Sequence, residues 1–338
     1  MRCYQFTDAI SLASLRLVER PDPEPGLHDI IIRMRAAALN FRDIAMIRGD
    51  YHIGVSPPLV PLSDGAGEVI RIGDAVTRFQ VGELACPTYL PDWHDGPLRA
   101  DRVRRRLGGP TDGVLTEYMC IHEDEAVRAP RHLDCTEAAA LPVAAVTAWR
   151  MLYRLGSLRP GETLLVQGGG AVSTTVLQLA KAGGARMIAV LRGDRHASAL
   201  KTLGADLVLT SGGGSTWPQE VREATLGLGV DVAINVAGGK TLTDTVAATK
   251  LEGTVHLIGF AAGSLAELDL FEAIRHGTTF HTATAGSRED FEAFVRAADH
   301  DGFRPVIAKV FRLDQMREAF QFFGEGGHHG KVVIDLDF

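Results

Sequence analysis

Three consecutive glycines at a predicted strand–helix junction are the residues of this chain whose spacing most directly implies chemistry. Thr163 to Gln167 predicts a short apolar strand, and the stretch after the glycines carries apolar residues at helical spacing. Glycines at such a junction let the backbone turn tightly and approach a pyrophosphate, which then lies at the positive, amide-rich end of the helix. The spacing matches a dinucleotide fingerprint except at Ser173, where a third glycine is usual. The expected dinucleotide contacts are Gly168, Gly169, Gly170, Ala171, Val172 and Ser173.

The end of the next predicted strand bears on which dinucleotide binds. Folds that select NAD place an acidic residue there to hold the ribose hydroxyls. This chain has Leu191 at that position and Arg192 after it, with Asp194 two residues further on. A guanidinium can pair with a 2′-phosphate. The sequence therefore favours NADPH, read by Arg192, with NADH as the open alternative.

Composition excludes several other classes of protein. The chain has 338 residues, 46% of them apolar, and a formal net charge of −7. That charge argues against a nucleic-acid partner. No apolar run approaches the length of a membrane span, and the first residues lack the apolar core of a secretory signal. Four widely spaced cysteines predict neither a disulfide framework nor a zinc ribbon, so we expect a cytoplasmic protein. The expected partner is a small-molecule substrate.

The pattern of predicted elements changes twice along the chain. Residues 1–130 read as short strands separated by turns, which predicts a β-rich, barrel-like domain. Residues 131–264 alternate strands and helices, which predicts an α/β fold with a doubly wound parallel sheet. Residues 265–338 return to mixed structure. The individual strands are expected at 29–38, 65–72, 163–167, 186–191, 207–210, 230–236, 254–259 and 331–335.

A series of short motifs resembles the medium-chain dehydrogenase/reductase superfamily over essentially the whole chain. The motifs occur in the family's order, from Leu39-Asn-Phe-Arg-Asp43 and Pro61-Leu-Ser-Asp-Gly-Ala-Gly67 through Leu203-Gly-Ala-Asp206 to Gly330-Lys-Val-Val333. The resemblance implies a GroES-like catalytic domain from 1–130 and 265–338, with a Rossmann domain inserted at 131–264. It also implies an active site between the two domains and a homodimer formed through Rossmann edge strands.

The positions that match the family's catalytic zinc ligands carry no good zinc donors. They are Asn40, Ser63 and Val143, with Asp64 next to the second. A catalytic zinc needs three nitrogen, sulfur or carboxylate donors and an open position. His328 and His329 lie in a glycine-rich turn and are interpreted as solvated. The sequence predicts no zinc.

Without a metal, hydride transfer needs another way to stabilise negative charge on oxygen. Reduction of a conjugated carbonyl or a quinone spreads that charge into an enolate, which hydrogen-bond donors and a proton source can serve. This matches the zinc-free branch of quinone oxidoreductases and enoyl reductases. Tyr51 is the candidate proton donor and Asn40 the candidate amide donor, although Asn40 could instead cap a helix over Phe41 to Arg48 with Asp43. Two other functions stay open: an alcohol dehydrogenase, and a cofactor-binding protein without turnover.

The resemblance also implies further cofactor contacts. A separate arginine-rich run has two possible roles. Thr147 matches a nicotinamide contact, and Lys331 could reach the site or be solvated. The expected additional contacts are Asn40, Thr147, Gly259, Phe260, Gly286, Ser287 and Lys331. The arginine-rich run from Arg99 to Arg106 is interpreted first as a solvated loop and second as a contact for an anionic substrate such as a CoA thioester.

Overall fold

The computed structural model describes residues 1–156, 158–212 and 216–338, and these form two compact units. The first unit contains Met1–Val146 and Ala285–Phe338, and the second contains Thr147–Thr284. The second unit is thus inserted in the sequence of the first, and the mixed α/β class agrees with the sequence-based expectation.

Both changes of unit come later in the chain than the expected boundaries at 130/131 and 264/265. The first is late because α2 (Cys135–Ala138) packs on the sheet of the first unit. The second is late because β13 (Thr279–Thr282) pairs in parallel with β12 (Thr249–Leu257) of the second unit. Sequence periodicity could not assign these segments, because each belongs to its unit only through tertiary pairing.

The first unit is built on a mostly antiparallel sheet with the order β14-β15-β3-β4-β5-β7, and β6 also pairs with β3. A separate hairpin joins β1 and β2. The strands are β1 (Arg2–Phe6), β2 (Leu15–Glu19), β3 (Asp29–Ala38), β4 (Asp64–Ile72), β5 (Leu84–Pro87), β6 (Tyr118–His122), β7 (Ala126–Arg128), β14 (Ile307–Arg312) and β15 (Lys331–Asp335).

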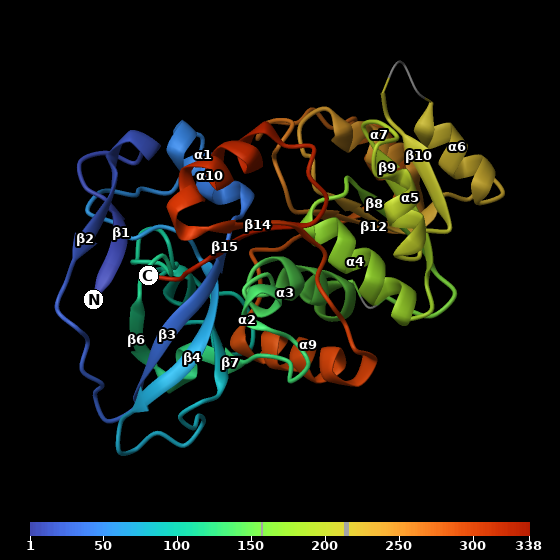
Figure 1. Ribbon diagram of the computed structural model, residues 1–338. Coiled ribbons are helices and arrows are strands. Elements are labelled where there is room, and N and C mark those ends of the chain that lie inside the picture. Colours follow the sequence, from blue (N-terminus) through green and yellow to red (C-terminus); the bar gives the residue numbers. More distant parts are fainter. Residues whose placement is uncertain (157, 213–215) are drawn as a thin grey trace. The chain divides into compact units, whose positions relative to one another are not determined.

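Three helices of the first unit pack against this sheet or against one another. They are α1 (Phe41–Arg48), α9 (Arg288–Asp301) and α10 (Met316–Glu325), and Figure 1 shows α10 beside α1. Apolar side chains from β3, β15 and α10, including Ile32, Phe320 and Ile334, fill one buried core. Burial of such side chains is the main source of stability for the unit.

The second unit is a parallel sheet with the order β10-β9-β8-β11-β12-β13. The strands are β8 (Thr163–Gln167), β9 (Arg186–Leu191), β10 (Leu207–Thr210), β11 (Val230–Asn235), β12 and β13. The order reverses at β8, so β8 and β11 flank the topological switch point where open α/β sheets bind ligands.

Helices connect these strands as right-handed crossovers require. They are α4 (Ala171–Ala182), α5 (Ala197–Thr202), α6 (Trp217–Ala224), α7 (Thr241–Ala248) and α8 (Leu270–His276), and α3 (Ala144–Trp149) runs across the change of unit into a π-helical turn at Arg150–Leu155. Among the residues of α4 that carry the apolar helical spacing, Val176 and Leu179 are buried and Val172 is half-buried, and Ser173–Thr175 are buried as well. The buried face of α4 is therefore wider than the apolar spacing alone predicted.

Within the described part of the chain, no helix has both the length and the apolar character that a bilayer crossing requires.

Candidate active site

Three strand ends of the first unit converge on one group of polar side chains. Because β3 runs antiparallel to both β4 and β15, its carboxyl end lies beside the amino ends of both neighbours: Ala38 pairs with Asp64 and with Val333. Asn40 follows β3, Ser63 precedes β4, and Lys331 begins β15. The topology therefore brings together residues that are almost 300 positions apart in the sequence.

These side chains form a closed ring of hydrogen bonds. The Lys331 ammonium donates to Asp64 Oδ2 at 2.7 Å and to Asn40 Oδ1 at 2.8 Å. Asn40 Nδ2 donates to Ser63 Oγ at 3.2 Å, and the Ser63 hydroxyl donates to Asp64 Oδ1 at 3.1 Å. Lys331, Asp64 and Ser63 are at most 2% exposed. Lys331 is therefore not the solvated lysine of one sequence interpretation, and a buried ion pair of this kind depends on complete hydrogen bonding.

The ring fixes the orientation of the Asn40 amide. Since an ammonium can only donate, the atom facing Lys331 must be the amide oxygen, and the nitrogen must face Ser63. An amide nitrogen carries two hydrogens, and across the described residues only Ser63 accepts one of them. Asn40 is half-buried, so its second N–H is an oriented donor without an acceptor in the fold.

Asn40 and Asp43 were both candidates for capping the start of α1. Asp43 accepts the Asn40 backbone N–H at 2.8 Å, while the Asn40 side chain is engaged by Lys331 and Ser63. Helix α1 ends at Gly49, whose φ of 79° is the left-handed conformation typical of a helix C-terminus. Asn40 is thus the N-cap position and Asp43 supplies the reciprocal half of a capping box. Burial raises the pKa of the Asp43 carboxyl to about 6.

A buried arginine holds Tyr51 against the first turn of α1. Arg42 donates to the carbonyl oxygens of Leu107 and Gly109, both at 3.0 Å, and its guanidinium lies 5.2 Å from the Tyr51 ring and 5.1 Å from the Tyr89 ring. The two tyrosine hydroxyls are 3.3 Å apart. Tyr51 therefore packs beside a residue only two positions from Asn40.

Tyr89 was not singled out from the sequence, and neither was the role of Arg42. Burial raises the pKa of the Tyr89 phenol, opposed by the positive charge of Arg42, so this hydroxyl is neutral at pH 7. A neutral phenol can both accept from and donate to Tyr51. The only signal in the sequence was the arginine inside the Leu39–Asp43 motif, whose partners come from distant loops.

One strained residue precedes the ring. Leu62 has a φ of 70°, although it is not a glycine, and its side chain is fully buried. Non-glycine residues adopt this conformation only where the surrounding structure imposes it, and such positions cluster at functional sites. The strain lies directly before Ser63 and Asp64, the two residues that complete the ring.

The donor set at these positions does not fit a catalytic zinc. Asp64 already accepts from Lys331, from Ser63 and from the Val143 backbone N–H at 3.3 Å, and the Asn40 oxygen faces the same ammonium. Val143 packs in an apolar cluster with Trp93. Among the described residues, no group of three or more His, Cys, Asp or Glu side chains is placed to hold a metal ion. Zinc requires imidazole, thiolate or carboxylate donors that are free to coordinate.

The glycine loop of the second unit has the geometry of a phosphate cradle. Gly168 has a φ of 76°, and a Cβ added at Gly170 would meet nothing within 4 Å. Helix α4 begins directly after Gly170, so the amides of its first turn face this open space. The Ser173 hydroxyl turns inward and donates to the Gln167 carbonyl at 2.6 Å. Ser173 therefore ties helix to strand, and only its backbone is available to a ligand.

Three other cofactor candidates of the second unit follow strands at the same carboxyl edge of the sheet. Arg192 directly follows β9 and is exposed, and it has no hydrogen-bond or ion-pair partner in the described chain. Gly259 and Phe260 follow β12, and a Cβ at Gly259 would lie 1.9 Å from the Val236 carbonyl oxygen. Thr147 is buried in α3.

Gly286 and Ser287 belong to the first unit, where they begin α9. The Ser287 hydroxyl accepts the Asp290 N–H at 3.1 Å, and the Ser287 N–H donates to the Asp290 carboxylate at 3.0 Å. This is a complete capping box. The expected role of this segment as a nicotinamide contact therefore depends on its backbone carbonyls, because the Ser287 side chain is already used.

The arginine-rich run divides into paired and unpaired residues. Arg105 pairs with Asp92 and Glu125, Arg102 with Asp95, and Arg99 with Asp101. Arg104 and Arg106 have no such partner anywhere in the part of the chain that the structure describes. Three arginines of the run are therefore held by ion pairs within the first unit, and two guanidinium groups remain available.

Comparison with known proteins agrees with this architecture. The alcohol dehydrogenase GroES-like domain family matches residues 26–131, and the zinc-binding dehydrogenase family matches residues 171–300. A zinc-type alcohol dehydrogenase-like protein of Schizosaccharomyces pombe is 32% identical over 319 residues, which cover 93% of this chain and 92% of that protein. An acryloyl-coenzyme A reductase of Metallosphaera sedula is 27% identical, covering 94% of this chain and 95% of its own.

A crystal structure from Sinorhizobium meliloti 1021, assigned provisionally as an alcohol dehydrogenase, is 34% identical with a TM-score of 0.91 and covers 99% of each chain. Fold, motifs and relatives together define the class: the chain belongs to the medium-chain dehydrogenase/reductase superfamily. Within it, this protein is an oxidoreductase of a family that binds a nicotinamide cofactor.

Proposed function

We propose that this protein is an NADPH-dependent, zinc-independent reductase of quinones, enones or other activated double bonds. The observation that carries the proposal is the hydrogen-bonded ring of Lys331, Asp64, Ser63 and Asn40. The ring includes two of the positions matched to zinc ligands, Asn40 and Ser63, and it contains a fixed ammonium and an oriented amide. A built-in donor of this kind can stabilise an oxyanion without a metal.

The cofactor would be held by the amides at the start of α4, and Arg192 would pair with the 2′-phosphate of NADPH. When bound, the reduced nicotinamide supplies the hydride. Gly170, where an added Cβ would meet nothing within 4 Å, leaves room for a pyrophosphate at the helix end. The unpaired guanidinium of Arg192 supports NADPH over NADH, because it carries a positive charge that the fold does not use.

On the substrate side, Asn40 and Tyr51 would have different roles. The free N–H of Asn40 would donate to the substrate carbonyl oxygen and bind it more strongly as negative charge develops there. The Tyr51 hydroxyl would then supply the proton that completes a two-electron reduction, with the Tyr89 hydroxyl 3.3 Å away as its hydrogen-bond partner. Hydride and proton together saturate the double bond.

A CoA thioester is a second candidate substrate within the same reaction class. The unpaired Arg104 and Arg106 favour it, because phosphate groups bind well to guanidinium groups. The acryloyl-coenzyme A reductase among the relatives acts on such a substrate by its name. Replacing both arginines with glutamine should raise KM for an enoyl-CoA and leave KM for a neutral enone unchanged.

The test is a product analysis with purified protein, NADPH and a panel of enones and quinones. The proposal predicts NADPH consumption that yields the saturated ketone or the hydroquinone. An allylic alcohol as the product would favour an alcohol dehydrogenase, the activity named for several relatives. Cofactor binding without any consumption would favour a protein without turnover.

A further inference from the structure

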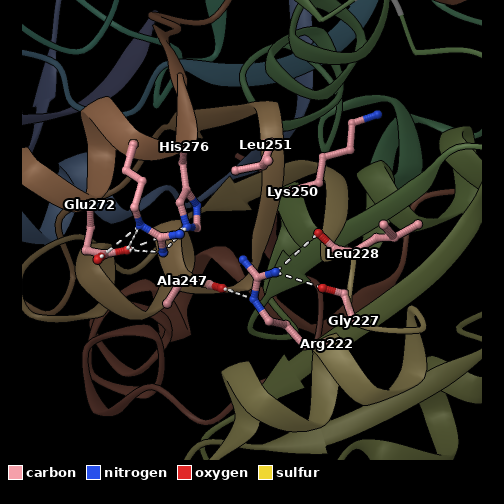
Figure 2. Close-up of a pocket in the computed structure, with 9 residues that line it drawn as sticks. Arg222, Gly227, Leu228, Ala247, Lys250, Leu251, Glu272 and His276 are labelled. Atoms are coloured by element: carbon pink, nitrogen blue, oxygen red, sulfur yellow. Dashed lines mark hydrogen bonds and ion pairs between the residues drawn. The ribbon is translucent and has the colours of Figure 1, made fainter.

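A basic pocket lies in the second unit, away from every residue assigned to the cofactor. It has a volume of about 480 Å³ and is shown in Figure 2. Its lining comes from α6, α7 and α8, from the loop that leads into β11, and from the first residues of β12. The lining residues are Arg222, Gly227, Leu228, Ala247, Lys250, Leu251, Glu272, Arg275 and His276.

The topology of the sheet separates this pocket from the dinucleotide candidates. Gly227 and Leu228 precede β11, and His276 precedes β13, so the pocket lies at the amino edge of the parallel sheet. The glycine loop and Arg192 follow β8 and β9 at the carboxyl edge. Strand β11 has six residues, so the two edges are roughly 20 Å apart at 3.3 Å per residue.

One wall of the pocket holds a cation without a carboxylate partner. Arg222 donates to the carbonyl oxygens of Ala247 and Gly227, both at 2.9 Å, and of Thr249 at 3.2 Å. These bonds fix the guanidinium but leave its full positive charge uncompensated. Lys250 is paired with Asp231, and in Figure 2 its side chain extends away from Arg222.

The opposite wall holds a buried donor without an acceptor. His276 is 3% exposed, and its Nε2 lies 3.0 Å from Nη2 of Arg275. A guanidinium cannot accept a hydrogen bond, so Nε2 is the acceptor in this pair and Nδ1 carries the ring proton. The same Nε2 lies 3.6 Å from Oε2 of Glu272. Within the described chain, this Nδ1 is buried and has no partner. Leaving a buried donor unsatisfied is unfavourable, and a bound acceptor would remove that cost.

Arg275 adds a further donor at the same wall. Its Nε and Nη2 bond to Glu272, and the described residues provide no acceptor for its Nη1. The pocket thus combines an uncompensated guanidinium charge, a free guanidinium N–H and a buried imidazole N–H. Such groups recognise an oxyanion.

We propose that this pocket is a second ligand site, which binds a small phosphate-bearing anion at the amino edge of the Rossmann sheet. The phosphate oxygens accept hydrogen bonds from His276 Nδ1 and Arg275 Nη1, and the charge of Arg222 attracts the ligand. The exposed side chains of Leu228 and Leu251 provide an apolar wall for the rest of the molecule.

The experiment measures thermal stabilisation of the full chain by inorganic phosphate, with sodium chloride at matched ionic strength as the reference. Saturating NADPH is present, so that the cofactor site does not bind the phosphate, and the measurement is repeated in Arg192→Gln. With a dissociation constant of about 1 mM, 10 mM phosphate should raise Tm by about 2 °C in both proteins.

Four variants locate the effect. His276→Leu and Arg275→Gln should each lose most of the shift, whereas His276→Asn, whose amide can place an N–H where Nδ1 was, should retain most of it. Lys201→Gln, which removes an exposed cation elsewhere on the same unit, should leave the shift unchanged. No stabilisation by phosphate, or equal stabilisation of His276→Leu and the unaltered protein, would overturn the proposal.

Discussion

The amide of Asn40 is the residue on which the proposed chemistry depends most. Lys331 and Ser63 orient it, and its second N–H is left for a ligand. Asn40→Ala should lower kcat/KM for an enone about 10²-fold, because removing one oxyanion donor typically has an effect of that size. Steady-state kinetics with NADPH and an enone checks this.

The same variant should bind NADPH normally and keep its unfolding temperature within a few degrees. The backbone N–H of residue 40 still donates to Asp43 in this variant, so that half of the capping box remains. Unchanged kcat/KM in Asn40→Ala would remove the amide from the mechanism.

The buried ion pair of Lys331 and Asp64 should be strongly coupled. Lys331→Met leaves a fully buried carboxylate without its cation, and we expect a loss of about 3–5 kcal/mol in unfolding free energy. The double variant Lys331→Met/Asp64→Leu should recover part of that loss, because it removes both charges. Urea unfolding of the two single variants and the double variant measures the coupling, and strictly additive losses would contradict it.

His256 predicts an acid sensitivity of the second unit. It is fully buried, neither ring nitrogen has a partner among the described residues, and burial lowers its pKa to about 4. Because the folded pKa is below the unfolded value of 6.5, the stabilisation is complete above pH 6.5 and is lost as pH falls through 4. The difference is on the order of 3 kcal/mol.

His256→Leu should therefore flatten the dependence of Tm on pH between about 6.5 and 4. The control is His300→Leu, which removes an exposed histidine of the first unit. If Tm fell equally steeply with decreasing pH in both variants, the acid sensitivity would belong to groups other than His256.

At the scale of elements, the turn between β8 and α4 should control cofactor affinity. Gly168 has a φ of 76°, which a β-branched residue adopts only with strain. Gly168→Val should therefore weaken NADPH binding at least about 10-fold, a change of 1.4 kcal/mol in binding free energy. Fluorescence titration with NADPH measures it.

A matched control exists seven residues earlier in the same unit. Gly161 has a φ of 86° and open space around it, so Gly161→Val suffers similar backbone strain outside the loop. NADPH affinity should be unchanged there. Equal weakening in both variants would show that general destabilisation, and not the loop, controls affinity.

Several elements could be predicted from sequence to the residue, and their reasons are local. Strands β3, β8, β9, β10 and β15 and helix α1 have the expected bounds, because apolar runs and turn residues mark both ends of each. Strand β12 begins at Thr249, five residues before its expected start, because its first residues pair only across to β11. Local patterns do not contain such partners.

The candidate site could be predicted only in part, again because some residues contact partners that are distant in the sequence. Asn40 and Tyr51 stand inside recognisable motifs, but Lys331 could not be separated from a solvated lysine, since its partner Asp64 lies 267 positions away. Arg42 and Tyr89 were missed because their contacts join α1 to two distant loops. Motif spacing places residues on elements, and only the packed sheet brings the elements together.

For the whole molecule, a homodimer stays a prediction, and the second unit offers a surface for it. Strand β13 is an edge of the parallel sheet, and the neighbouring α8 exposes Leu270, Phe271 and Ile274, which are 66%, 72% and 78% exposed. Free strand edges and apolar patches are liabilities unless they are covered. Phe271→Glu should therefore shift the protein from dimer to monomer in light-scattering chromatography. Leu17→Glu, an exposed position on β2, should not, and a monomeric unaltered protein would refute the prediction.

The most direct test of the central claim is turnover by metal-free protein. Purified protein is treated with a strong chelator, its zinc content is measured, and NADPH-dependent reduction of an enone is followed before and after zinc is returned. The expected result is full activity with far less than one zinc per chain and no gain on adding zinc. Activity that falls with the zinc content and returns with the metal would contradict the assignment of catalysis to Asn40, Tyr51 and the Lys331 ring.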